Sequence, residues 1–189
     1  MNPYDFALLA KRAYSDAPTV GKADSASRMH VYGDVHVFRG SDDSASWRAD
    51  LDCSAVEVFG WGKIHAGFFG AYAAIMPACM GLPAPSASAG HSLGAPLCVF
   101  HSLAWAERGV IVPIYAFEPP KFCLDGVMAD LIKSKGIPFY ACRNGHDLVT
   151  QVPPNMTLPG PLIQIGKPAL PVDNIVDHDI NRVISALQA

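Results

Sequence analysis

Charged side chains are scarce in this sequence, at 16% of its 189 residues, and neither sign dominates. The 14 Lys and Arg residues stand against 17 Asp and Glu residues, a formal net charge of −3 at pH 7, so the chain lacks the basic surface that attracts nucleic acids or anionic membranes. It also lacks an uninterrupted apolar run near the roughly 20 residues of a membrane-spanning helix. Even residues 67–80 are too short, and they contain Pro77. We therefore expect a soluble protein with no nucleic-acid partner and no transmembrane segment.

Disulfide and zinc-binding patterns are missing as well. The cysteines are odd in number, widely separated and without a C-x-x-C pair: Cys53, Cys79, Cys98, Cys123 and Cys142. We interpret them as reduced, mostly buried small side chains, and we expect no metal site. The first residues show no basic segment followed by a long apolar core, which predicts no secretory signal and a cytoplasmic location. Release by lysis or by a non-classical route is left open.

The chain has enough apolar residues for a folded core. Half of its residues are hydrophobic, and glycine and proline are spread along it, so we treat residues 1–189 as a single domain. Residues 5–14 fit an amphipathic helix, which we expect at the edge of a sheet. Residues 29–32 and 35–38 flank the pair Gly33-Asp34 and predict an antiparallel hairpin, with His30 and His36 on its solvent face.

Short β-rich runs and helical patterns alternate through the rest of the chain. We expect strands at residues 55–59, 85–89, 111–117, 137–142 and 162–165, and helices at 65–80, 93–108, 125–135 and 180–187. Such alternation implies right-handed crossovers between parallel strands. The predicted fold class is α/β, a mostly parallel central sheet with an N-terminal antiparallel hairpin and helices on both faces.

One segment carries a possible nucleophile. Residues 90–94, Gly-His-Ser-Leu-Gly, match the G-x-S-x-G nucleophile elbow, in which a serine sits on a sharp turn between a strand and a helix. Larger side chains at either glycine would collide with nearby backbone, while Ser92 is pushed outward above the positive end of the helix. A serine-capped, glycine-rich turn without catalytic function is the alternative interpretation.

A serine hydroxyl needs a base and an orienting acid. In α/β hydrolases these follow the serine in the order acid, then histidine. Of the three later histidines, His101 lies in the helix that follows Ser92 and points away from it, and His146 directly adjoins Asp147. The remaining one, His178, lies in a loop before the last helix, where the base of this fold belongs.

The orienting acid is expected at the end of a different parallel strand. Asp147 follows the run at residues 137–142 and precedes Pro153-Pro154, so we assign it that role. The other carboxylates fit less well. Asp125 and Asp130 belong to a predicted helix, Asp173 shares the histidine's own loop, and we interpret Asp177 and Asp179 as helix-capping or solvated.

A serine nucleophile that forms a tetrahedral intermediate also needs donors for the oxyanion of that intermediate. The backbone N–H of Leu93 is the first donor, since it follows the nucleophile. The second is expected after an earlier strand, where Ser41 offers a backbone N–H and a hydroxyl. We interpret Arg39 as a structural residue of that loop and His65 as a structural histidine.

Four segments together resemble the class 3 lipases, the α/β-hydrolase family that includes fungal triacylglycerol lipases. They are residues 38–41 (Phe-Arg-Gly-Ser) with Trp47, residues 64–68 (Ile-His-Ala-Gly-Phe) with Tyr72, residues 90–95, and residues 147–149 with Pro153-Pro154. The resemblance implies Ser92 as nucleophile, Asp147 as acid, His178 as base, and the N–H groups of Ser41 and Leu93 as oxyanion hole. It also implies hydrolysis of small-molecule or lipid esters without a metal or an organic cofactor.

Three departures from the family pattern bear on function. Ala95 and Pro96 follow the elbow where a second glycine is usual, and residues 117–121 replace a Gly-x-Pro-Arg type of turn. Only about residues 41–52 are available as a lid, with Trp47 as its one large apolar residue, so we expect an esterase or small lipase with at most transient contact with a lipid surface. A non-catalytic binding protein on the same scaffold and an acyltransferase with the same triad remain alternatives. The sequence does not indicate an oligomeric state.

Overall fold

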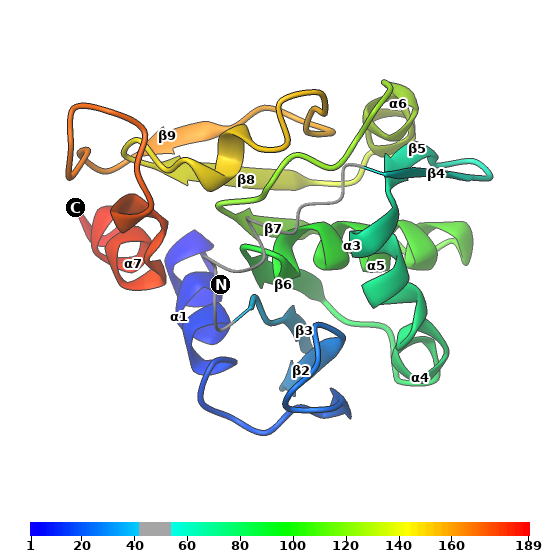
Figure 1. The fold of residues 1–189 in the computed structure, drawn as a ribbon. Helices are drawn as coiled ribbons and strands as arrows, with labels where there is room; N and C mark the ends of the chain where they lie inside the picture. Colours follow the sequence, from blue (N-terminus) through cyan, green and yellow to red (C-terminus); the bar gives the residue numbers. More distant parts are fainter. Residues whose placement is uncertain (42–53) are drawn as a thin grey trace.

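A seven-stranded sheet forms the centre of the molecule in the computed structural model, which describes residues 1–41 and 54–189 (Figure 1). Its spatial order is β1-β2-β3-β6-β7-β8-β9. The strands are β1 Val20–Gly21, β2 Arg28–Tyr32, β3 Val35–Phe38, β6 Ala87–His91, β7 Ile114–Phe117, β8 Phe139–Asn144 and β9 Ile163–Ile165. β1 and β2 are antiparallel to their neighbours, and every pair from β3 to β9 is parallel. The predicted α/β class, hairpin and mostly parallel sheet are confirmed.

Helices cover both faces of this sheet, as predicted. On one face, α5 Gly94–Glu107 packs on β6 and β7, with α3 Ala66–Ala73 and α6 Val127–Ser134 in the same apolar cluster. On the other face, α1 Pro3–Arg12 and α7 Ile180–Gln188 pack against each other and cover the second cluster (Figure 1). Because a parallel sheet is buried on both faces, its strands position the residues at their carboxyl ends with little freedom.

The position of α1 differs from the sequence-based expectation. It lies on the face of the sheet, in contact with β6 and α7, and not at a sheet edge. Phe6 stacks on Tyr115 of β7 with ring centroids 3.8 Å apart, and Ala7 and Ala10 are buried. The small alanines let α1 approach the middle of the sheet closely, which its amphipathic pattern alone did not indicate.

A second, two-stranded sheet precedes the central strand β6. It pairs β4 Ala55–Val58 with β5 Gly62–His65, antiparallel. The first of these strands was predicted, but the second was not. The helical spacing at residues 65–80 corresponds to two helices, α3 and α4 Met76–Met80, with Pro77 in the first turn of the second helix, where proline is favoured. His65 is structural, as predicted: it caps α3 by accepting a hydrogen bond from the amide N–H of Phe68.

Among the described residues, no helix is long and apolar enough to cross a bilayer. Four cysteines, Cys79, Cys98, Cys123 and Cys142, are buried free thiols, while Cys53 lies outside the described residues.

The placement of His30 and His36 on the solvent face is wrong, since both side chains are buried. Strand β3 is paired on both sides and covered on both faces, so its alternate positions point into two different apolar clusters. His36 Nδ1 lies 2.9 Å from Nε2 of His101, which also accepts a hydrogen bond from the indole N–H of Trp105 at 3.0 Å. An indole nitrogen only donates, so this Nε2 carries no proton and accepts from both neighbours.

The His36–His101 pair is therefore neutral in the folded protein. Burial lowers the pKa of His36 to about 4 and that of His101 to about 3, the latter with a further contribution from His36. The remaining N–H of His101, on Nδ1, donates to the hydroxyl oxygen of Tyr72 at 3.2 Å. Protonating His101 would place a second donor against Trp105 and His36.

We expect this pair to make stability fall in acid. In the unfolded chain both histidines have a pKa near 6.5, so the unfolded state binds more protons between about pH 6.5 and pH 4. The stabilisation is complete above pH 6.5 and is lost as the pH falls, by about 2 kcal/mol for each histidine at pH 5. Urea unfolding of the native protein and of His36→Asn at pH 7.5 and pH 5 measures this loss.

The His36→Asn variant keeps a donor near the position of Nδ1 but does not titrate. Its free energy of unfolding should fall by about 2 kcal/mol less than that of the native protein. Equal losses in the two proteins would contradict a neutral, buried His36.

Candidate active site

Ser92 occupies a sharp turn between β6 and α5. Its backbone has φ = 57°, a left-handed conformation that residues other than glycine rarely adopt. A Cβ on Gly90 would lie 2.1 Å from the carbonyl oxygen of Gly94, and a Cβ on Gly94 would lie 2.0 Å from that of Phe38. Both glycines are therefore required by close backbone approaches, which is the structural basis of the G-x-S-x-G spacing.

The proline after the elbow does not displace Ser92. Pro96 lies in the first turn of α5, where a missing N–H leaves no helical hydrogen bond unmade, and the helix continues to Glu107. The amide N–H of Ala95 bonds to the carbonyl oxygen of Ser92 at 2.9 Å, which closes the turn.

The structure brings Ser92, His178 and Asp147 together. His178 Nε2 lies 2.8 Å from Ser92 Oγ, and His178 Nδ1 lies 3.0 Å from Asp147 Oδ2. Since a carboxylate only accepts, Nδ1 carries the proton and Nε2 is free to accept the serine hydroxyl proton. The three side chains are almost fully buried, with Asp147 at 0% exposure.

Separate loops hold the base and the acid. Asp147 follows β8, and its other oxygen, Oδ1, accepts from the amide N–H of Val149 at 2.9 Å. His178 ends a short 3-10 turn, Val176–His178, that leads into α7. The side chain of Asp179 then caps α7 by accepting from the amide N–H of Asn181, as predicted.

Asp177 is not solvated, contrary to the sequence-based interpretation. It is fully buried and accepts hydrogen bonds from the amide N–H groups of His146 and Ala169 and from the side chain of Asn174. Burial raises the pKa of Asp177, but these hydrogen bonds and the charge of Arg182 together lower it by a larger amount. The net effect is a pKa below the usual range. Its carboxylate joins the base loop to the acid loop.

The predicted oxyanion donors both lie close to Ser92. Leu93 follows it directly and is the N-cap residue of α5, and Ser41 lines the same cavity as Ser92 and His178. A Cβ on Gly40 would lie 3.0 Å from Ser92 Cβ, so the chain that carries Ser41 passes directly beside the elbow. Arg39 is structural here, with its guanidinium 5.2 Å from the ring centre of Tyr14. Trp47, the predicted lid residue, lies outside the described residues.

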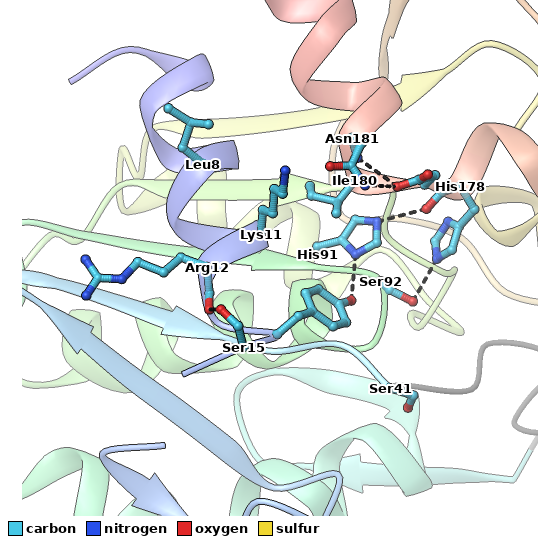
Figure 2. Close-up of a pocket in the computed structure, with 12 residues that line it drawn as sticks. Leu8, Lys11, Arg12, Ser15, Ser41, His91, Ser92, His178, Ile180 and Asn181 are labelled. Atoms are coloured by element: carbon cyan, nitrogen blue, oxygen red, sulfur yellow. Dashed lines mark hydrogen bonds between the residues drawn. The ribbon is translucent and has the colours of Figure 1, made fainter. Parts of the chain in front are cut away.

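A cavity of about 700 Å³ opens onto Ser92 (Figure 2). One wall is formed by α1, including Leu8 and Lys11, and the other by the start of α7, including Ile180. The cavity lining thus combines apolar surface with the cationic side chains of Lys11 and Arg12.

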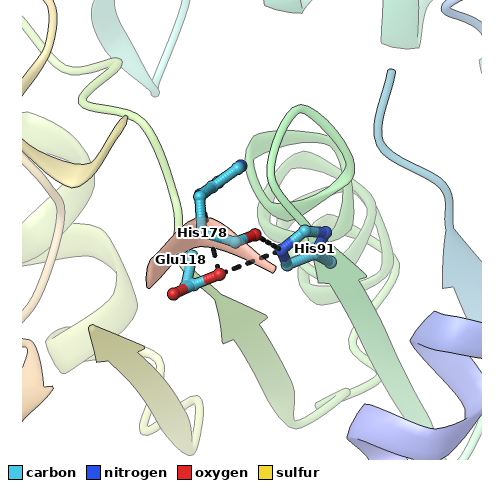
Figure 3. A group of neighbouring side chains, drawn as sticks. All are labelled: His91, Glu118 and His178. Carbon is cyan, nitrogen blue, oxygen red and sulfur yellow. Dashed lines mark hydrogen bonds and ion pairs between the residues drawn. The ribbon is translucent and has the colours of Figure 1, made fainter. Parts of the chain in front are cut away.

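The sequence-based reasoning missed a second group of side chains near His178: Tyr14, His91 and Glu118. Figure 2 shows His91 beside Ser92 and His178, and Figure 3 shows His91 and Glu118 together with His178. His91 Nδ1 lies 2.7 Å from the Tyr14 hydroxyl, and its Nε2 lies 3.1 Å from Glu118 Oε2 and 3.2 Å from the backbone oxygen of His178. Glu118 follows β7 just as Asp147 follows β8. This position after a parallel strand is the feature of the sequence from which Glu118 could have been predicted as a site residue.

His91, Glu118 and His178 also have ligand-type atoms within 4.8 Å of one another. Their donor set, two imidazoles and a carboxylate, is one that zinc accepts. However, the same atoms are engaged in hydrogen bonds, with His178 Nδ1 held by Asp147 and His91 Nε2 by the backbone of His178. These hydrogen bonds need protons on the same nitrogen atoms that would have to bind a metal. The group therefore fits a hydrogen-bonded network better than a metal site.

Comparisons with known proteins agree with this geometry. The sequence profile of the family described as "Lipase (class 3)" matches residues 35–157, well over half of the chain. A comparison with curated protein sequences finds no significant match.

Solved fungal lipases share the fold at low sequence identity. The lipase from Rhizopus microsporus var. chinensis matches with a TM-score of 0.69 and 18% identity, over 93% of this chain and 84% of that one. Rhizomucor miehei triacylglyceride lipase matches with a TM-score of 0.66 and 19% identity, over 93% and 90% of the two chains. Lipase II from Rhizopus niveus matches with a TM-score of 0.61 and 20% identity, over 77% and 69%.

Fold and site together define a serine hydrolase of the α/β class. The chain belongs to the class 3 lipase family, and it is a carboxylic-ester hydrolase of the serine type.

The elbow glycines provide a direct test of the site geometry. Gly90→Ala should lower the free energy of unfolding by about 3 kcal/mol or more and abolish labelling of Ser92 by a fluorophosphonate, because the new Cβ meets backbone at 2.1 Å. Gly70→Ala on α3 is the matched control, since a Cβ there meets nothing within 4 Å. Urea unfolding and labelling rates measure both effects, and equal behaviour of the two variants would contradict the close approach at Gly90.

The hydrogen-bonded state of His91, Glu118 and His178 predicts that chelation has no effect. Dialysis against EDTA should leave the rate of ester hydrolysis unchanged. Initial rates before and after dialysis measure this. A loss of activity that added Zn²⁺ restores would show instead that the three side chains hold a metal.

Proposed function

We propose that the chain hydrolyses carboxylic esters through an acyl-enzyme intermediate, with Ser92 as nucleophile, His178 as base and Asp147 as orienting acid. The observation that carries this proposal is the pair of contacts made by one imidazole, 2.8 Å from Nε2 to Ser92 Oγ and 3.0 Å from Nδ1 to Asp147 Oδ2. Both distances are within the range of a nucleophile activated by a base and a base oriented by an acid.

In the first half-reaction, Ser92 Oγ attacks the ester carbonyl carbon while its proton moves to His178 Nε2. The carbonyl oxygen becomes an oxyanion, to which the N–H groups of Leu93 and Ser41 donate hydrogen bonds. The intermediate then collapses, the bond to the alcohol oxygen breaks, and His178 gives its proton to the departing alcohol.

In the second half-reaction, water attacks the acyl-serine and loses a proton to His178. Collapse of the second tetrahedral intermediate breaks the ester bond to Ser92 Oγ, which takes the proton back from His178. The carboxylic acid product leaves, and the triad returns to its starting state. Asp147 stabilises the imidazolium in both steps.

The cavity supports a small or medium-sized ester as substrate. Its volume of about 700 Å³ lies within the range of pockets that enclose drug-sized molecules. Leu8 and Ile180 offer apolar contact for an acyl chain or an alcohol group, and Lys11 adds a positive charge beside them. We propose an esterase or small lipase that acts on accessible esters, with transient contact with a lipid surface as a further option.

Initial-rate hydrolysis of p-nitrophenyl esters from acetyl to palmitoyl tests this function. Ser92→Ala should reduce kcat by at least about 10⁴-fold because the nucleophile is removed while the fold is unchanged. Ser102→Ala is the matched control, as it removes another buried serine, whose hydroxyl donates to the carbonyl oxygen of Cys98 within α5.

The chain-length profile then separates an esterase from a lipase. Absence of turnover on every ester, together with no fluorophosphonate labelling of Ser92, would contradict the proposed function and favour a non-catalytic binding protein. Turnover that increases with an added alcohol acceptor would indicate acyl transfer.

A further inference from the structure

The buried carboxyl group of Glu118 has no role in the mechanism above. Glu118 directly follows β7 and is 0% exposed. Its backbone has φ = 50°, and among the described residues only Ser92 and Glu118 adopt a left-handed conformation without being glycine. The amide N–H of Glu118 donates to the carbonyl oxygen of Cys142 at 2.9 Å, which anchors it against β8. A strained backbone and a buried acid at one position are costly, and such costs concentrate at functional sites.

Two carboxyl groups converge on the same nitrogen. His178 Nδ1 lies 3.0 Å from Asp147 Oδ2 and 3.6 Å from Glu118 Oε2. The two acids reach it from the carboxyl ends of neighbouring parallel strands, since Glu118 follows β7 and Asp147 follows β8. In the resting geometry the single N–H of His178 points to the nearer acid, and Glu118 lies just beyond hydrogen-bond distance.

His91 holds Glu118 in this place (Figure 3). The backbone oxygen of His178 only accepts, so the proton of His91 lies on Nε2, and the same N–H is 3.1 Å from Glu118 Oε2. His91 Nδ1 then accepts from the hydroxyl of Tyr14 at 2.7 Å. Burial, followed by the nearby His178, lowers the pKa of His91 far below its usual value, in agreement with a neutral ring in this arrangement.

Glu118 is harder to ionise than an ordinary glutamic acid. Burial and then the negative charge of Asp147 raise the pKa of Glu118 far above its usual value, with smaller contributions in the same direction from Asp177 and Asp179. The backbone of Asn144 acts in the opposite sense. Removal of the charge on Asp147 would eliminate the second of these causes and favour ionised Glu118 beside the histidine.

We propose that Glu118 is a second positioning acid for the catalytic base: Asp147 and Glu118 form a two-carboxyl unit around His178 Nδ1 in which either acid alone orients the imidazole. This inference rests on the proposed function, because it assigns His178 as the base. It requires only a small shift of the His178 ring toward Glu118 when Asp147 is neutral.

A double-mutant cycle in kcat tests the proposal with four proteins: native, Glu118→Gln, Asp147→Asn and the double variant. We expect Glu118→Gln to lower kcat by less than about 10-fold and Asp147→Asn by about 10²-fold, while the double variant loses about 10⁴-fold, as in a triad without any acid. The double variant then loses at least about 10-fold more than the product of the single losses. Losses that multiply would overturn the proposal.

Asp125→Asn combined with Asp147→Asn is the control. It removes a carboxylate that accepts hydrogen bonds from the amide N–H groups of Lys63 and Val127, outside the loops that carry Asp147 and His178. We expect the losses of this pair to multiply. Glu118→Leu replaces Glu118→Gln if the amide prevents folding, as judged by urea unfolding.

A spectroscopic measurement separates positioning from a structural role. The Nδ1 proton of an imidazole bonded to a carboxylate gives a far-downfield proton NMR signal, which should persist in Asp147→Asn and vanish in the double variant. Its disappearance from folded Asp147→Asn would overturn the proposal. Absence of Ser92-dependent turnover in the native protein would instead contradict the proposed function, so the two failures are distinguishable.

Discussion

The site depends on the left-handed backbone of Ser92 and on the close approaches that maintain it. A residue in this conformation lowers the stability of the fold by on the order of 1–3 kcal/mol, so contacts with the surrounding structure have to hold it in place. The structure does so through β6, which is hydrogen-bonded on both sides, and through α5, whose first residue touches the backbone at the end of β3. Because Gly90 and Gly94 have no side chains, strand, turn and helix close around the serine.

Once the serine is placed, the remaining groups are assembled from the ends of the neighbouring strands. Glu118 follows β7 and Asp147 follows β8, and the parallel register brings both to the same edge of the sheet. His178 comes from outside the sheet, so its loop needs its own support. Buried Asp177 gives that support by accepting hydrogen bonds from the backbone of His146 and Ala169.

Much of this arrangement could be predicted from the sequence, and particular residues show where prediction stopped. Periodicity and turn residues located the hairpin, the parallel strands and α5, α6 and α7, and chain order selected the three residues that now lie together. Strand β5 was missed because residues 62–65 lack an alternating apolar pattern. His30 and His36 were placed on the wrong face because alternation within a strand does not reveal that both faces are covered.

The part of the site that escaped prediction depends on contacts between distant segments. Tyr14 and His91 are 77 positions apart, and neither belongs to a motif that pairs them. Glu118 lies within a turn that departs from the family pattern, so its burial and its approach to His178 follow only from the packing of β7 against β8. Side-chain networks of this kind are set by tertiary structure and leave little trace in local sequence.

The residues of α1 that line the cavity are far in the sequence from the triad residues. Leu8 and Lys11 line the space in front of the serine, whereas the three triad residues lie between residues 92 and 178. Substitutions at these two positions of the first helix would therefore change the cavity, and with it the esters it admits, without touching the triad. Tyr14 sets a limit to that freedom, since its hydroxyl bonds to His91 and so joins the segment after α1 to the side chains around His178.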